Sequence, residues 1–165
     1  MNLSMLTLVT SSLISATAIA SERPQISQLD GGWRGLAKQS DPFDTKRIEI
    51  IQIFKGDVTF LCGELNMKTK ESGFDAFSFD AQLKYVVDEQ APVDKRGKYS
   101  TSLSGSKMVA RNRYYSSKLS SEEVESIKFG KVLKVAGQFS TSGWETTSVD
   151  LTGFASAYEK MCNSN

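Results

Sequence analysis

The clearest pattern in the chain is a strict alternation of apolar and polar residues between positions 77 and 87. The apolar members are Phe77, Phe79, Ala81, Leu83, Tyr85 and Val87. A period of two places these side chains on one face of an extended strand and the polar residues between them on the other. The pattern therefore predicts one long, half-buried β-strand.

Shorter strand-like segments lie on both sides of this one, at the spacing of hairpins. They cover residues 46–54, 58–62, 99–103, 108–114, 132–139 and 145–151. Turn-forming residues separate them, for example at 41–44, 55–57 and 104–106. No helical crossover between parallel strands is indicated. We therefore expect a mainly β fold with seven or eight antiparallel strands, either a β-sandwich or a small barrel.

Gly63 interrupts one of these alternations. Val58, Phe60 and Cys62 share a face before it, whereas Leu65 and Met67 do so after it. A β-bulge at Gly63 accounts for this change of phase, because a bulge inserts one extra residue into a strand.

Two short helices are predicted, one before the last hairpin and one at the C-terminus. Ser120 and Glu123 have the spacing of a capping box, and Gly130 provides a stop signal. Towards the C-terminus, the apolar residues Leu151, Phe154, Ala155, Tyr158, Met161 and Cys162 form a stripe. This spacing predicts a helix that packs against the core of the fold.

The first 20 residues have the character of a secretory signal peptide. They are small or apolar, Ala18 and Ala20 stand where cleavage requires small residues, and the first charge is Glu22. A transmembrane helix is the alternative, but the segment is short, contains Ser and Thr, and lacks a basic flank. We expect residues 1–20 to be a cleaved leader and 21–165 to be a single β-rich domain. The mature protein is then periplasmic or secreted, with no stable membrane insertion.

The two cysteines, Cys62 and Cys162, are expected to form a disulfide in an exported protein. A redox-active or nucleophilic thiol is the alternative. It is disfavoured because the chain has no CxxC pair and no histidine to lower a thiol pKa. The bond would tie the C-terminal helix to a central strand.

Charge and composition restrict the classes of function. Lys plus Arg number 20 and Asp plus Glu number 19, so no overall field attracts nucleic acid, and no nucleic-acid partner is expected. The absence of histidine removes the commonest general base and zinc ligand. Three carboxylate pairs remain, Asp41 with Asp44, Asp75 with Asp80 and Glu122 with Glu123, but turns, an exposed strand and a helix cap account for them. We therefore predict a non-enzymatic protein with no metal and no cofactor.

One local concentration of cations and aromatic residues is a candidate binding face. Arg111, Arg113 and Tyr115 share one face of a predicted strand, where they are suited to a small anionic or sugar ligand or to an acidic protein surface. A solvated outer strand face is the alternative. Trp33, which lies among glycines, is either part of a binding surface or a plug at one end of the core.

The chain also resembles the periplasmic proteins associated with type VI secretion called TagO or VasI. The residues that carry the resemblance are 83–88 (LKYVVD), 133–135 (LKV) and 149–154 (VDLTGF), with Ala157 and Cys162. Trp33, the turn at 41–44 and Cys62 occupy comparable places. Val149 departs from the pattern, which has an aromatic residue there. The resemblance implies an accessory role at an envelope secretion machine and assigns no catalytic residue.

Three functions follow as hypotheses. The first is an exported, non-enzymatic accessory or binding protein whose partner is an envelope protein or a small anionic or sugar ligand. The second is a periplasmic inhibitor or immunity protein that blocks an envelope hydrolase or a toxin. A third, an enzyme that uses a carboxylate pair, is the least favoured because it lacks a convincing set of catalytic groups.

Overall fold

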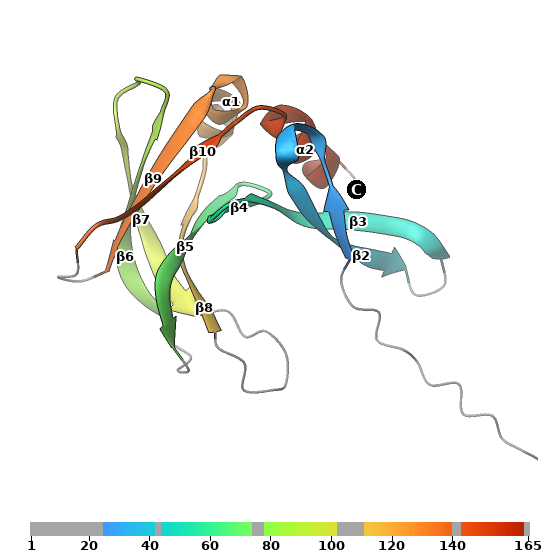
Figure 1. Ribbon diagram of the computed structural model, residues 1–165, viewed down its shortest axis with the longest axis horizontal. Helices are drawn as coiled ribbons and strands as arrows, with labels where there is room; N and C mark the ends of the chain where they lie inside the picture. Colours follow the sequence, from blue (N-terminus) through green and yellow to red (C-terminus); the bar gives the residue numbers. More distant parts are fainter. Residues whose placement is uncertain (1–24, 42–43, 74–77, 102–110, 140–142, 164–165) are drawn as a thin grey trace, which may run out of the picture.

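The computed structural model describes residues 25–41, 44–73, 78–101, 111–139 and 143–163 (Figure 1). The predicted signal peptide lies outside these residues, as does the predicted turn at 104–106. The elements in chain order are β1 (Gln25–Gln28), a 3-10 turn η1 (Asp30–Gly32), β2 (Arg34–Asp41), β3 (Asp44–Lys55), β4 (Val58–Leu61), β5 (Glu64–Gly73), β6 (Ser78–Val87), β7 (Val93–Thr101), β8 (Arg111–Lys118), α1 (Ser121–Phe129), β9 (Val132–Phe139), β10 (Glu145–Asp150) and α2 (Phe154–Cys162). In the described part of the chain, neither α-helix has the length and apolar character needed to cross a membrane.

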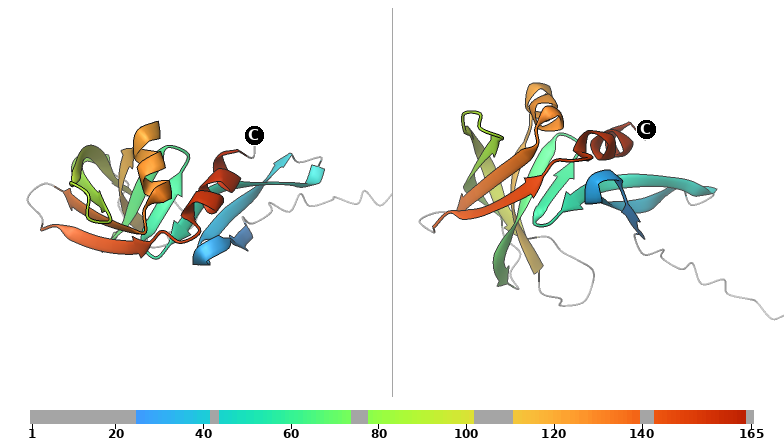
Figure 2. Two further views of the ribbon diagram at one scale, coloured as in Figure 1. Left: turned by 90° about the horizontal axis from the view of Figure 1, so that it is seen from above. Right: turned by 45° about the horizontal axis from the view of Figure 1, so that its top comes forward.

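The described strands form one open antiparallel sheet in the order β1-β2-β3-β4-β5-β8-β7-β6-β9-β10. The predicted class is thereby confirmed: mainly β, antiparallel, with two short helices. The strands do not divide into the two facing sheets of a sandwich. Instead the sheet curls, so that β10 contacts β4 and β5, while β1 to β3 extend away from the curled part (Figures 1 and 2).

The interior of the curl is the hydrophobic core. Ala81, Leu83, Tyr85 and Val87 of β6 are all buried, which confirms the alternation predicted for this strand. Gly137 of β9 allows strands on opposite sides of the curl to approach, since a Cβ there would lie 2.3 Å from the Tyr115 ring of β8. The Glu145 side chain of β10 also accepts a hydrogen bond of 2.8 Å from the backbone amide of Lys70 in β5.

Helix α1 begins with the predicted capping box. The Glu123 amide donates to the Ser120 hydroxyl at 3.2 Å, and the Ser120 amide donates to the Glu123 carboxylate at 2.6 Å. That carboxylate also accepts hydrogen bonds of 2.8 and 2.9 Å from Lys95 of β7. Partial burial opposes its ionisation, but these donors and Tyr85 together lower the pKa of Glu123. The cap therefore also anchors α1 to the sheet.

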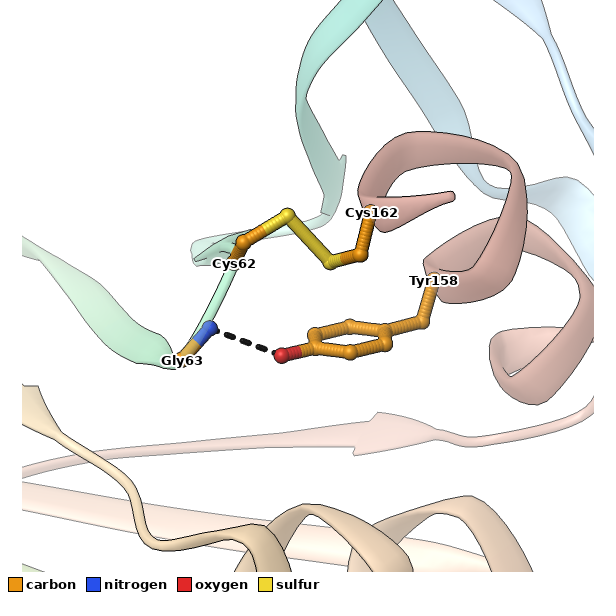
Figure 3. The surroundings of a disulfide bond; sticks show 4 residues. All are labelled: Cys62, Gly63, Tyr158 and Cys162. Carbon is orange, nitrogen blue, oxygen red and sulfur yellow. Dashed lines mark hydrogen bonds between the residues drawn. A yellow bond between two sulfur atoms is a disulfide. The ribbon is translucent and has the colours of Figure 1, made fainter. Parts of the chain in front are cut away.

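Helix α2 is held to the sheet by the predicted disulfide, which is confirmed (Figure 3). The bond joins Cys162, the last residue of α2, to Cys62 in the turn after β4, with the two Cα atoms 5.6 Å apart. One turn earlier, the Tyr158 hydroxyl accepts a hydrogen bond of 2.7 Å from the Gly63 amide. Covalent and polar contacts thus fasten the same helix to the same turn.

Trp33 belongs to the core that α2 covers. Its ring is fully buried and packs against Phe60 and Phe154, with centroid distances of 5.9 and 5.2 Å. Its indole Nε1 donates to the Thr152 carbonyl at 3.1 Å. The interpretation of Trp33 as a core plug is consistent with this burial. The alternative, a place in a binding surface, is wrong because a buried ring offers no surface to a ligand.

The bulge predicted at Gly63 is wrong. Leu61 pairs with Glu64, so Cys62 and Gly63 form the turn of a tight hairpin between β4 and β5. Gly63 has φ +71°, which lies in the left-handed region that favours glycine. The change of phase in the sequence therefore marks a reversal of direction.

Replacing Gly63 by valine is expected to lower the free energy of unfolding by about 1 to 3 kcal/mol, because a β-branched residue is strained at positive φ. Urea denaturation measures this change. Space is not the cause, since no atom lies within 4 Å of a Cβ at this position. A valine variant as stable as the wild type would show that the turn relaxes to a negative φ at little cost.

Candidate ligand-binding site

The strand face predicted to bind a ligand through Arg113 and Tyr115 points into the curl. Tyr115 is only 1% exposed, and its ring lies 5.0 Å from that of Tyr99. Arg113 lies on the same side, where its Nη1 donates to the Tyr99 hydroxyl at 3.4 Å. The assignment of this face to solvent is therefore wrong: the space left by Gly137 admits the Tyr115 ring. The side chain of Arg111 lies outside the described part.

The opposite face of the sheet carries a row of mainly polar residues. Pairing between neighbouring strands aligns Gln28, Arg34, Phe54, Thr59, Asn66, Ser116, Lys98 and Asp80 across eight strands, from β1 to β6. Thr59, Asn66 and Ser116 alternate with buried residues, as Asn66 does between Leu65 and Met67. We call this row, with the residues that flank it, the outer face.

A hollow of about 240 Å³ lies on the outer face around Asn66. Residues from five strands line it, namely Gln52, Thr59, Leu61, Glu64, Asn66, Ser100, Tyr114 and Ser116. Most of these side chains are amides or hydroxyls, while Leu61 and Tyr114 add apolar surface. We call it the Asn66 hollow.

Asn66 is the most unusual residue of this hollow. Its side chain is buried, with the residue only 7% exposed, yet its amide Nδ2 has no hydrogen-bond partner in the described structure. Leaving a buried polar group unpaired costs about 1 to 3 kcal/mol. Folding alone therefore does not favour asparagine here, whereas a ligand oxygen in the hollow would satisfy the free N–H group.

A second hollow, of about 550 Å³, adjoins the first and shares Glu64 and Ser116 with it. Its lining includes Lys95, Arg96, Lys98 and Lys118 against the carboxylates of Glu64 and Asp80. Cations thus outnumber anions, and we call this second space the basic hollow. A third hollow continues the outer face beyond it and shares Asp80, Arg96 and Gly97.

Part of the charge in the basic hollow is paired. Lys98 Nζ lies 2.5 Å from a carboxylate oxygen of Asp80, and the hydrogen bond from Lys98 lowers the pKa of Asp80. Lys95 is bound to Glu123. No salt bridge joins Arg96 or Lys118 to another residue that the structure describes. Lys118 is therefore available to a ligand, and so is Arg96, whose charge attracts Asp80 without forming a salt bridge with it.

No protein-family model matches the chain, and no curated protein or solved structure is significantly similar to it. No residue role passes to this chain from a relative. The roles given to Asn66, Arg96 and Lys118 accordingly rest on their positions, burial and contacts. Within the described ranges, no group of three or more Cys, Asp or Glu residues is placed to hold a metal ion.

Sequence reasoning did not find the Asn66 hollow, and only a weak signal for it exists. Asn66 occupies a polar position of an alternating strand, where most residues simply face solvent. The one local sign is a short amide side chain among β-strand residues, because asparagine is depleted in strands. The residues that bury Asn66 come from strands distant in sequence, so pairing of the whole sheet was needed to place them together.

Proposed function

We propose that the chain is an exported, non-enzymatic accessory or binding protein of the cell envelope that recognises an envelope component through its outer face. The observation that carries this proposal is the buried, unpartnered amide of Asn66 in a polar hollow. Such a group opposes folding by about 1 to 3 kcal/mol unless it is paired. A bound envelope component that accepts a hydrogen bond from the Asn66 amide would remove this cost.

Export is supported by the disulfide. Bonds between cysteines persist in oxidising compartments such as the periplasm and are rare in the cytosol. The Cys62–Cys162 bond closes a loop of 100 residues and fixes the C-terminal helix, as a structural disulfide does. Together with the predicted leader at residues 1–20, it favours a periplasmic or secreted location. A link with an envelope secretion machine follows from the resemblance to the TagO and VasI proteins and belongs to the same proposal.

The groups that line the outer face favour ligand binding over catalysis. Amides and hydroxyls such as those of Gln52, Thr59 and Asn66 orient a ligand through hydrogen bonds. The Asp80 carboxylate is held by Lys98, which keeps it charged and occupied. These groups are suited to recognition.

Capture from an envelope extract tests this function. The mature protein is immobilised and compared with Asn66→Ala and with Gln25→Ala, a control that removes an exposed amide from β1. We expect wild type and Gln25→Ala to retain the same envelope component and Asn66→Ala to lose most of it. Capture that is equal in all three, or absent in all three, would contradict the proposal.

An inhibitor or immunity function is the second candidate, and Trp144 favours it. This residue precedes β10, is 42% exposed, and has Lys84 Nζ 5.5 Å from its ring centroid. Exposed tryptophans are frequent anchors of protein interfaces. If this candidate holds, the same experiment retains a single hydrolase or toxin, and Trp144→Ala abolishes that capture while Asn66→Ala does not.

A further inference from the structure

We propose that the ligand of the outer face is an acidic sugar, whose ring occupies the Asn66 hollow and whose carboxylate reaches the basic hollow. The inference rests on the proposed function, because it names the ligand class of the same face. Three features of the outer face support it: the lining of the first hollow, the charge of the second and the distance between them.

The lining of the Asn66 hollow matches a sugar ring. A sugar hydroxyl both donates and accepts hydrogen bonds, and the hollow offers amides (Gln52, Asn66), hydroxyls (including Thr59) and the Glu64 carboxylate. Leu61 and Tyr114 provide apolar surface for the C–H groups of a ring. The volume of about 240 Å³ lies just below the roughly 300 to 1,000 Å³ of small-molecule pockets, so it suits one ring.

The basic hollow favours a single negative charge. Lys98 and Lys95 are paired with Asp80 and Glu123, which leaves Arg96 and Lys118 against Glu64. The excess is one positive charge. This matches a carboxylate better than a phosphate monoester, whose charge at neutral pH is about −1.5 to −2. A guanidinium such as that of Arg96 also binds a carboxylate through two parallel hydrogen bonds.

The two hollows are close enough for one small molecule. They share Glu64 and Ser116, so the lining is continuous. Lys118, one of the two cations outside a salt bridge, pairs with Glu64, which lies two residues from Asn66 on β5. One strand spacing and two residues along the strand amount to about 8 Å. One sugar with a short acidic substituent covers this distance.

Titration with two matched sugars tests the inference. N-acetylmuramic acid and N-acetylglucosamine differ by one ether-linked acid group, so they separate the contributions of the two hollows. We expect the acidic sugar to bind the full mature protein about tenfold more tightly, as followed by NMR shifts of backbone amides on the outer face. Added salt should reduce this preference, because screening weakens exposed charge pairs.

Four variants test which hollow contacts the sugar ring and which contacts its acid group. Asn66→Ala should weaken both sugars about fivefold to tenfold, the value of one lost hydrogen bond. Arg96→Gln, an exposed change that leaves the core intact, should weaken only the acidic sugar by a similar factor. Gln25→Ala and Lys134→Gln, which alter exposed residues that line neither hollow, should bind both sugars as the wild type does.

Three results would overturn the inference. Equal affinity for the two sugars would show that the basic hollow does not bind the acid group. Tighter binding of N-acetylglucosamine 6-phosphate than of N-acetylmuramic acid would show that the basic hollow prefers a phosphate to a carboxylate. Absence of binding to either sugar, while envelope capture still depends on Asn66, would reject a sugar and leave the proposed function standing. If that capture is also absent, both proposals fail.

Discussion

Replacing Cys62 and Cys162 by alanine is expected to lower the free energy of unfolding by about 4 to 5 kcal/mol. The bond closes a loop of 100 residues, and in the chain-entropy model a crosslink of this span restricts the unfolded state by that amount. This loss is a large part of the total, because the free energy of unfolding of a small domain is only about 5 to 15 kcal/mol. Urea denaturation of the oxidised wild type and the double variant measures the difference.

The wild type treated with reductant provides the control, and it should unfold at the same urea concentration as the double alanine variant. Tyr158→Phe separates the neighbouring contact. It removes only the hydrogen bond from the Gly63 amide and should cost about 1 kcal/mol. A loss below about 1 kcal/mol for the double variant would show that packing alone holds α2 and that the unfolded chain is already restricted.

Gly31→Ala is expected to have the second large effect, with a loss of about 3 kcal/mol or more. Gly31 has φ +64°, and a Cβ on it would overlap the Thr152 carbonyl oxygen at 1.8 Å. Positive φ costs an alanine about 1 to 2 kcal/mol, and displacing backbone adds about 1 to 3 kcal/mol. The substitution therefore separates η1 from the segment that leads into α2.

Gly32 offers a matched control one residue away. Its φ is +78°, but the nearest atom to a Cβ there is the flexible Lys55 Cε at 3.9 Å. Gly32→Ala should accordingly cost only the backbone strain, about 1 to 2 kcal/mol. Equal unfolding free energies for the two variants, measured by urea denaturation, would mean that the close approach of Gly31 to Thr152 does not constrain the fold.

The sequence predicted those elements whose own residues carry the signal. The alternation from Ala81 to Val87 identifies β6, and the pair Ser120 and Glu123 identifies the start of α1. Residues 25–28 and 34–41 were not predicted as strands, since glutamine, serine and lysine there show no apolar alternation. Pairing of β2 with β3, and of β1 with β2, makes them strands, and these partners are not visible locally.

The candidate site was harder to predict for a related reason. Alternation shows which residues of β8 share a face, but not which face meets the core. Both faces of this strand carry a tyrosine, Tyr114 and Tyr115, so the pattern does not choose between them. The buried environment of Asn66 arises from the pairing of β5 with β4 and β8. The disulfide, by contrast, needed no such information, because the chain contains only two cysteines.

The central claim is that Asn66 serves binding and not folding. Urea unfolding of Asn66→Leu and wild type, with and without N-acetylmuramic acid, tests it most directly. Without ligand, the leucine variant should be as stable as the wild type or more stable by about 1 kcal/mol, because the unpaired amide is gone and the hollow accepts the larger side chain. Ligand at ten times its Kd should stabilise the wild type by about 1.4 kcal/mol and the variant far less. A variant that is strongly destabilised, yet gains as much from the ligand as the wild type does, would contradict the claim.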